Sequence, residues 1–304
     1  PSLPPAILGH CSAPLVTLSE TQSRDVLIAA AHFRLQKKAA TLATLTELHG
    51  PDEALFQSIA TTLGYKNNKL PFTLLAQRLP LRILRKSHPT SLLFGTSGFL
   101  PNQDLGPFDH PTRSYLRKLW DLWWPERAEF ARFSIPPKLW NLSGQRPSNH
   151  PQRRLAALAA IVRHWPKIRA LRDLSLPSEI FPFFTSLTDP FWNHHYTIHS
   201  KPTPKPMALI GTSRITDILA NVFFPLAIAT DEKRWISFLK LRAPVASQRA
   251  KIAAFRLFGN SPRAREFLKF AALQQGLLQV YEDFCLRDLS DCSTCLFPRQ
   301  ISQW

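Results

Sequence analysis

The sequence predicts a mostly α-helical protein, an irregular multi-helix domain with a short non-helical excursion near residues 181–206. Three observations predict this class. Apolar residues recur at helical spacing through most of the chain, runs of strict polar and apolar alternation are scarce, and 27 prolines outnumber 10 glycines. Because proline suits the first turn of a helix and the residues after its end, this balance is typical of many short helices. We expect residues 1–304 to form a single helical domain.

The first predicted helix begins at Ser19, after an extended segment over residues 1–18. Ser19 and Gln22 have the spacing of a capping box, in which each side chain accepts a hydrogen bond from the other residue's backbone N–H. Gly50 is a favoured helix terminator, so we expect the helix to end there. Further helices are predicted over 52–63, 71–79, 81–87 and 112–123, with a packed glycine turn at 94–99 and a loop at 101–111.

The second half of the chain begins with an irregular segment over 134–151, which contains four prolines. A helix from Pro151 to about Trp165 follows, and then one further helical turn. The last predicted helix begins at Pro262, because Ser261 is a good N-cap and proline suits the first helical position. Beyond the excursion, helices are thus predicted over 213–229, 231–241, 247–257 and 262–284.

The chain carries a large excess of positive charge. It has 38 Lys and Arg residues against 21 Asp and Glu residues, a formal net charge of +17 and an isoelectric point near 10.3. Such a chain favours polyanionic partners, either nucleic acid or an anionic membrane surface. There is no apolar run long enough to span a bilayer and no signal peptide at the start, so we expect a cytoplasmic protein that binds nucleic acid and no membrane.

The basic residues are unevenly distributed. Three stretches contain many of them and no acid, namely residues 54–103, 130–172 and 233–265. Cations that follow a nucleic-acid backbone release counterions from it, so binding of this kind weakens steeply with salt. We expect the phosphate contacts to come from the second stretch, through Arg146, Arg153, Arg154, Arg163 and Lys167.

Aromatic side chains accompany these charges. Trp140, His164 and Trp165 lie among the arginines and could stack on unpaired bases. The alternative interpretation is a solvated cationic face with buried tryptophans. The sequence contains no helix-turn-helix, zinc-finger or single-strand barrel signature, so the mode of binding, and the choice between DNA and RNA, stay open.

The four cysteines of the chain lie at its two ends: Cys11, Cys285, Cys292 and Cys295. Cys292 and Cys295 form a C-x-x-C pair, whose thiolates can reach one tetrahedral ion without strain. If all four meet, they could hold a structural zinc ion or an iron–sulfur cluster and join the ends of the chain. The alternatives are four free thiols, or a disulfide or redox pair at Cys292 and Cys295.

No catalytic constellation stands out. His195 and His199 are four residues apart, as in the H-E-x-x-H zinc motif, but the glutamate is absent and the flanking residues are not typical of a helix. Packing or surface histidines are the favoured interpretation. Neither a Ser-His-Asp order nor a pair of carboxylates is evident, and acids are sparse for a nuclease centre. The sequence therefore identifies no reaction.

An ordered set of motifs resembles a known family. The motifs are Gly-Tyr-Lys-Asn-Asn-Lys-Leu-Pro-Phe at 64–72, Leu-Leu-Phe-Gly-Thr-Ser-Gly-Phe-Leu at 92–100, Arg-Pro-Ser-Asn-His-Pro-Gln-Arg-Arg at 146–154, Trp-Asn-His-His-Tyr at 192–196 and the closing Cys-x6-Cys-x2-Cys. Together they resemble domain-of-unknown-function family 2851, a family of uncharacterised bacterial proteins, over nearly the whole chain. One departure is His150, where the family motif usually has an aromatic residue.

The resemblance implies a role for Arg146, Asn149, Arg154 and the cysteines. It also implies that this chain is the C-terminal helical part of a longer protein, whose N-terminal region looks like a PD-(D/E)XK nuclease core. The chain begins with Pro1 and its only methionine is Met207, so we expect a domain before Pro1. The leading hypothesis is a nucleic-acid-binding helical region of a nuclease-like protein. The alternative is a structural scaffold or protein-interaction domain without nucleic-acid contact.

Overall fold

The predicted mostly α-helical class is confirmed. The computed structural model describes residues 7–101, 105–144, 146–174, 177–231, 233–287, 292–301 and 303. Within these ranges no strand forms, and a single isolated antiparallel bridge joins Arg242 to Phe270. None of the helices in the described part of the chain has the length and apolar character needed to cross a membrane. The cytoplasmic location stays a prediction.

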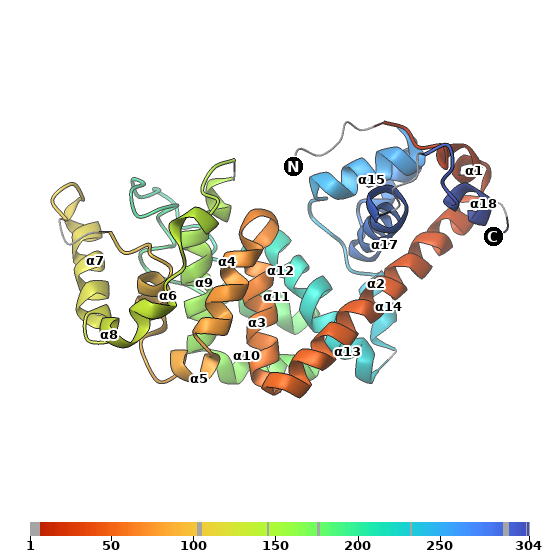
Figure 1. Ribbon diagram of the computed structural model, residues 1–304. Helices are drawn as coiled ribbons and strands as arrows, with labels where there is room; N and C mark the ends of the chain where they lie inside the picture. The colour runs from red at the N-terminus through yellow and green to blue at the C-terminus, as the bar shows by residue number, and fades with distance from the viewer. Residues whose placement is uncertain are drawn as a thin grey trace. The chain divides into compact units, whose positions relative to one another are not determined.

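The chain divides into two compact units (Figure 1). Unit 1 consists of residues 1–41 and 219–304, and unit 2 consists of residues 42–218. The single domain expected over residues 1–304 stays a prediction.

Unit 1 is built on the long helix α2 (Glu20–His49), whose last turns belong to unit 2. Ser19 caps α2 as predicted: its hydroxyl accepts from the N–H of Gln22, and the Gln22 amide oxygen accepts from the N–H of Ser19. The other elements are α1 (Ser12–Thr17), the π-helix η4 (Leu219–Phe223), α13 (Phe224–Thr230), α14 (Arg234–Leu239), α15 (Gln248–Phe258), α16 (Pro262–Phe267), α17 (Ala271–Tyr281), the π-helix η5 (Glu282–Arg287) and α18 (Phe297–Ile301).

Two predictions in unit 1 are wrong. The expected extended segment over residues 1–18 contains the short helix α1, because burial of Leu15 against the core of unit 1 favours a helical turn there. The expected continuous helix over 262–284 is broken between α16 and α17. Phe270 is extended, and the backbone there pairs with the segment around Arg242: Ala271 N–H donates to Leu241 O at 2.8 Å. A tertiary hydrogen bond thus overrides local helix propensity.

Unit 2 surrounds α9 (Pro151–Arg163), whose residues 151–162 are all buried. The predicted irregular segment over 134–151 is confirmed, with short 3₁₀ turns at Pro137–Leu139 (η2) and Pro147–Asn149 (η3). The remaining elements are α3 (Pro51–Leu63), α4 (Tyr65–Arg78), α5 (Leu81–Leu84), α6 (Pro89–Thr96), α7 (His110–Trp123), α8 (Arg127–Phe130), the 3₁₀ turn η1 (Ala131–Phe133), α10 (Trp165–Leu174), α11 (Pro177–Ser186) and α12 (Thr212–Ile218).

The glycine turn expected at 94–99 overlaps the end of α6, and two boundaries in unit 2 differ most from the expectation. The helix α4 begins at Tyr65 rather than at Pro71, across a kink at Asn68. The non-helical excursion runs from residue 187 to residue 211, because α11 extends to Ser186 despite Pro182 in its middle. The buried face of α11, formed by Ile180 and Phe184, is apolar, and its burial favours the helix.

The helix α7 is amphipathic, and its position is fixed on its buried side. Thr112, Leu116, Leu119 and Trp123 form that side. The carboxylate of Asp109 caps the helix by accepting from the N–H of Thr112 at 2.9 Å. In α6, Gly95 allows close approach of the Trp123 ring: a Cβ at Gly95 would lie 2.3 Å from the Trp123 Cδ2 atom.

We expect Gly95→Ala to destabilise unit 2 by about 1–3 kcal/mol, because the new methyl group displaces a rigid, buried indole ring. Equilibrium denaturation of the two proteins measures the difference. Gly211→Ala is the matched control, since a Cβ there meets nothing within 4 Å. Equal losses for both variants would contradict the close packing of α6 on α7.

Candidate nucleic-acid interface

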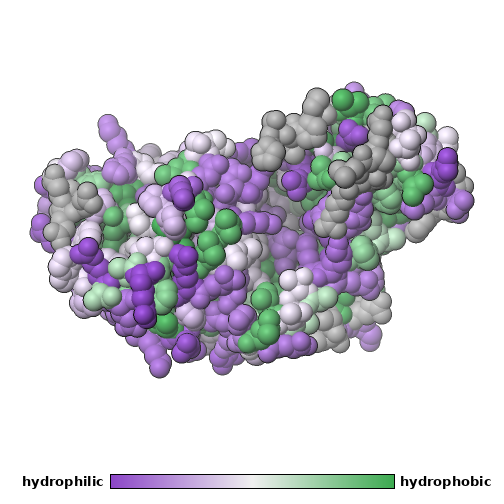
Figure 2. Space-filling model, in the orientation of Figure 1, coloured by the Kyte–Doolittle hydropathy of each residue, from purple (hydrophilic) through white to green (hydrophobic). Residues whose placement is uncertain are grey.

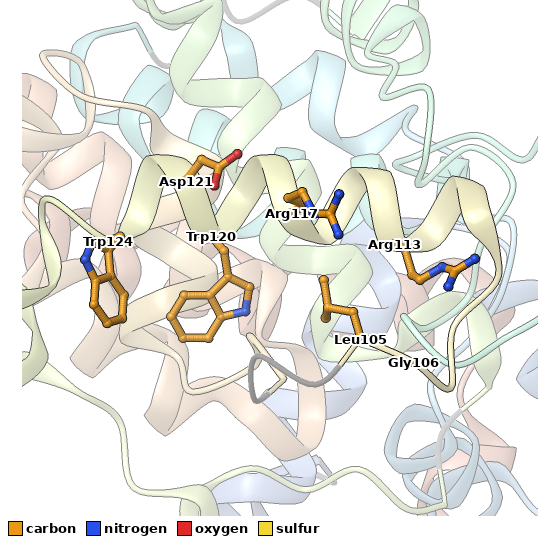
Figure 3. Close-up of a pocket in the computed structure, with 7 residues that line it drawn as sticks. All are labelled: Leu105, Gly106, Arg113, Arg117, Trp120, Asp121 and Trp124. Atoms are coloured by element: carbon orange, nitrogen blue, oxygen red, sulfur yellow. The ribbon is translucent and has the colours of Figure 1, made fainter.

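The exposed face of α7 carries two arginines and two tryptophans in one row. Arg113, Arg117, Trp120 and Trp124 follow one another at intervals of four, three and four residues, which places them on one side of the helix and its C-cap. They line a pocket of about 380 Å³ together with Leu105, Gly106 and Asp121 (Figure 3). A volume of this size is in the range of small-molecule and cofactor sites.

The two indole rings of the pocket differ in their hydrogen bonding and in their exposure to solvent. The Nε1–H of Trp120 donates to the carbonyl oxygen of Pro101 at 3.0 Å, so this ring is fixed. Trp124 is 55% exposed, and its ring centroid lies 6.3 Å from that of Trp120. The guanidinium carbon of Arg127 lies 5.3 Å from the centre of the Trp124 ring. Trp124 therefore offers an open aromatic surface bordered by a cation.

The pocket is positively charged. Arg113 and Arg117 are both exposed, and neither forms an ion pair with another residue that the structure describes. Asp121 is the acid among the lining residues. Over unit 2, the face drawn in Figure 2 is mainly hydrophilic, with hydrophobic atoms in separate patches. The guanidinium groups of Arg113 and Arg117 are thus available to an anionic ligand.

The opposite side of α7 is anchored to the non-helical excursion. The Tyr115 ring stacks on Phe191 with centroids 4.0 Å apart, and its hydroxyl accepts a 2.7 Å hydrogen bond from Trp192 Nε1–H. Burial raises the pKa of the Tyr115 phenol, so it stays neutral and acts as a structural contact. These contacts hold the exposed row of α7 on a rigid support.

The arginines predicted from the sequence divide into buried and exposed groups. Arg153 is 1% exposed, and its guanidinium donates to the carbonyl oxygens of Trp192, His195 and Ala208. Arg154 is 5% exposed, and its Nη2 donates to the side-chain oxygen of Asn149. Neither guanidinium lies on the surface, so a nucleic-acid strand that follows the surface does not reach them.

The other three predicted cations are exposed. Arg146 lies in the loop before η3, and Lys167 lies on α10. Arg163, at the end of α9, donates to the hydroxyl of Thr90 at 2.9 Å and lies 3.7 Å from a carboxylate oxygen of Asp189. These side chains can contact a polyanion, and the exposed ring of His164 lies between Arg163 and Lys167 in the sequence.

The stacking predicted for Trp140 and Trp165 is wrong, and the alternative of buried tryptophans is correct. Trp165 is fully buried and meets Phe56 edge to face. Trp140 is 8% exposed, and its Nε1–H donates to Ser97 O at 2.9 Å. His164 is exposed, with its Nδ1 2.9 Å from Ala160 O. Since tryptophan is the largest apolar side chain, the core of unit 2 takes up both indoles.

The histidines of the excursion pack as the favoured interpretation predicted. His195 is buried, its ring stacks on Phe191 with centroids 3.9 Å apart, and its Nδ1 lies 2.9 Å from Phe191 O. The His199 ring lies 4.9 Å from the Phe108 ring. They therefore serve the fold.

The structure brings the four thiols of unit 1 together. Cys11 begins α1, Cys285 lies in η5, and Cys292 and Cys295 precede α18. The backbone N–H of His10 donates to the sulfur of Cys292 at 3.3 Å. Burial raises the pKa of Cys11 to about 12, and the three other thiols add to this shift.

A metal site is not formed by the side chains as they stand. No disulfide involves any of the four cysteines. Among the residues that the structure describes, no group of three or more His, Cys, Asp or Glu side chains is arranged to hold a metal ion. The zinc or iron–sulfur site stays a prediction.

The sequence reasoning missed the row on α7. Residues 105–129 are not one of the acid-free stretches, because they contain Asp109, Asp121, Glu126 and Glu129. The helical spacing of Arg113, Arg117, Trp120 and Trp124 was a usable indication. Asp109 itself serves as the N-cap of α7, so its presence says nothing against a basic surface.

The comparisons with known proteins identify a family. The family model described as "Protein of unknown function (DUF2851)" matches residues 7–242, a range that contains α7, α9 and the excursion and ends before Cys285. No curated protein matches the chain, and no solved structure matches it.

Proposed function

Since the chain belongs to this family, whose description assigns no activity, we propose a function from its own side chains: it binds single-stranded nucleic acid at the α7 pocket. Arg113 and Arg117 hold phosphates, and an unpaired base stacks on Trp124. The observation that carries the proposal is the single row of cations and indole rings around one pocket. Positive grooves with aromatic platforms are the usual way in which proteins bind single strands.

The choice of a single strand follows from the shape of the site. A base can stack on Trp124 only when it is unpaired and turned outward. A duplex presents phosphates to the arginines but keeps its bases stacked on one another, so it leaves the indole surface unused. The expected partner is therefore single-stranded DNA or RNA, and a nuclease-like region before Pro1 stays an expectation.

Replacement of Trp124 tests the aromatic part of the site. We expect Trp124→Ala to weaken binding of a fluorescent single-stranded oligonucleotide about tenfold, because base stacking contributes about 1–3 kcal/mol per base. Trp124→Phe keeps an aromatic face and is expected to retain most of the affinity. Fluorescence anisotropy measures both variants. Equal affinity of the alanine variant and the unaltered protein would refute stacking on this ring.

We also propose that Cys11, Cys285, Cys292 and Cys295 hold a structural zinc ion or an iron–sulfur cluster that joins the ends of unit 1. The support is that four thiols from distant parts of the sequence share one neighbourhood. Metal binding replaces the thiol protons, so it overcomes the raised pKa of Cys11.

Elemental analysis of anaerobically purified protein tests this assignment. We expect about one zinc ion, or the iron of one cluster, per chain, because four thiolates complete the coordination of either. Cys11→Ser is expected to lower the metal content, and iron–sulfur absorption distinguishes the two metals. A metal content well below one per chain would refute the metal site and favour the alternative of four free thiols.

A further inference from the structure

Two buried guanidinium groups that interact electrostatically, Arg154 at the start of α9 and Arg214 at the start of α12, lie away from the row on α7 in sequence. Arg154 and Arg214 are each 5% exposed. Arg214 Nη1 donates to the Asp217 carboxylate at 2.7 Å, and Arg154 Nη2 donates to Asn149. The Nε and Nη1 atoms of Arg154 and the Nε atom of Arg214 are buried without a hydrogen-bond partner among the described residues. Buried donors of this kind are costly unless a ligand completes them.

The charges around Arg154 are unbalanced. Burial, and to a smaller extent the neighbouring Arg214 and Arg153, lower the pKa of the Arg154 guanidinium to about 9. The carboxylate of Asp217 acts in the opposite direction. Arg153 and Arg154 also lie in the first turn of α9, which contains no acid. The start of a helix carries partial positive charge and favours anions, so two arginines there are unfavourable by themselves. An anion is the group that this arrangement lacks.

Partly exposed side chains separate the two guanidinium groups from solvent. Tyr65, Asn149 and Asp217 are each partly exposed. The guanidinium carbon of Arg214 lies 3.9 Å from the centre of the Tyr65 ring. Tyr65 has a φ of 51°, the single positive value at a described residue other than glycine. Strained backbone of this kind collects at ligand sites, and here it holds the ring against Arg214.

We propose that this cluster, defined by Tyr65, Asn149, Arg154, Arg214 and Asp217, binds a phosphomonoester: the terminal phosphate of a nucleic-acid strand. A terminal phosphate has up to two negative charges and three free oxygens, which suit the unpartnered guanidinium donors. An internal phosphodiester has one charge and a sugar on each side, so it does not enter a buried site. The ligand takes the place of the Asn149 or Asp217 side chain beside the arginines.

This inference rests on the proposed function, and one set of oligonucleotides separates the two. Three single strands of identical sequence carry a 5′-phosphate, a 3′-phosphate or hydroxyl groups at both ends, and anisotropy gives their affinities. We expect one phosphorylated strand to bind about tenfold more tightly than the hydroxyl strand, because its terminal phosphate forms charge-assisted hydrogen bonds with the guanidinium groups that a hydroxyl group does not form. Inorganic phosphate, at matched ionic strength, should remove the difference and leave the binding. Equal affinities overturn the terminal-phosphate site but not the α7 site, and no binding of any strand overturns both.

Variants test whether the cluster causes the preference for a strand with a terminal phosphate. Arg214→Gln should abolish it, whereas Asp217→Asn, which removes the competing carboxylate, should increase it. Arg117→Gln is the matched control: it should weaken all three strands and leave their ratio unchanged. If Arg214→Gln does not fold, Asp217→Asn decides, and a preference that is unchanged or smaller in this variant overturns the assignment.

Discussion

Replacement of Arg113 and Arg117 together by glutamine is expected to weaken single-strand binding by about 10- to 100-fold, because two charge-assisted phosphate contacts are lost. The two side chains are exposed on one face of α7, and neither forms an ion pair with a described acid, so their removal breaks no ion pair among the described residues. We expect unchanged thermal stability. Fluorescence anisotropy over a range of salt concentrations measures the loss.

The salt dependence of the binding affinity is a second measurement on the same variant. Each phosphate contact to a single strand contributes about 0.7 to the slope of log affinity against log salt, so the slope should fall by about 1.4. Arg169→Gln is the control, since it removes one positive charge, half the change of the double variant, at an arginine already bonded to Asp52. If the double variant binds as well as the control, the phosphates lie elsewhere, and the scaffold alternative becomes the better account.

The fold class was predictable because helical periodicity and proline placement act locally. The Ser19–Gln22 capping box and the Ser261 cap formed as their sequences indicate. The break before Ala271 was not predictable, because it depends on a backbone hydrogen bond to Leu241, thirty residues earlier in the chain. Local propensity cannot anticipate a partner that only the tertiary fold supplies.

The candidate site, like the fold, was only partly predictable from the sequence. Net charge indicated a polyanionic partner, but composition does not distinguish a solvated arginine from a buried one. Arg153 and Arg154 lie on a helix that is buried on every side through residue 162, and the uninterrupted apolar run over residues 155–162 is the indication of this burial. The acids near α7 concealed its basic face in the sequence: Asp109 caps the helix, and Asp121 lines the same pocket as Arg117.

Arg153 illustrates what burial does to a predicted phosphate ligand. Its guanidinium donates three hydrogen bonds to carbonyl oxygens at positions 192, 195 and 208, all within the non-helical excursion. An excursion without regular structure has few backbone partners of its own, so its carbonyl groups need donors from elsewhere. The guanidinium of Arg153 is such a donor, and it fixes the excursion on α9.

We therefore expect Arg153→Met to destabilise unit 2 by about 2–6 kcal/mol, because the buried carbonyl groups of Trp192 and His195 lose their donor at about 1–3 kcal/mol each. Chemical denaturation measures the loss, and hydrogen exchange should rise over residues 192–208. Arg163→Met, the same substitution at the end of α9, removes one exposed hydrogen bond and one long ion pair, so it should change stability by about 1 kcal/mol or less. A stable Arg153→Met variant with weakened nucleic-acid binding would instead restore the phosphate contact that the sequence predicted for Arg153.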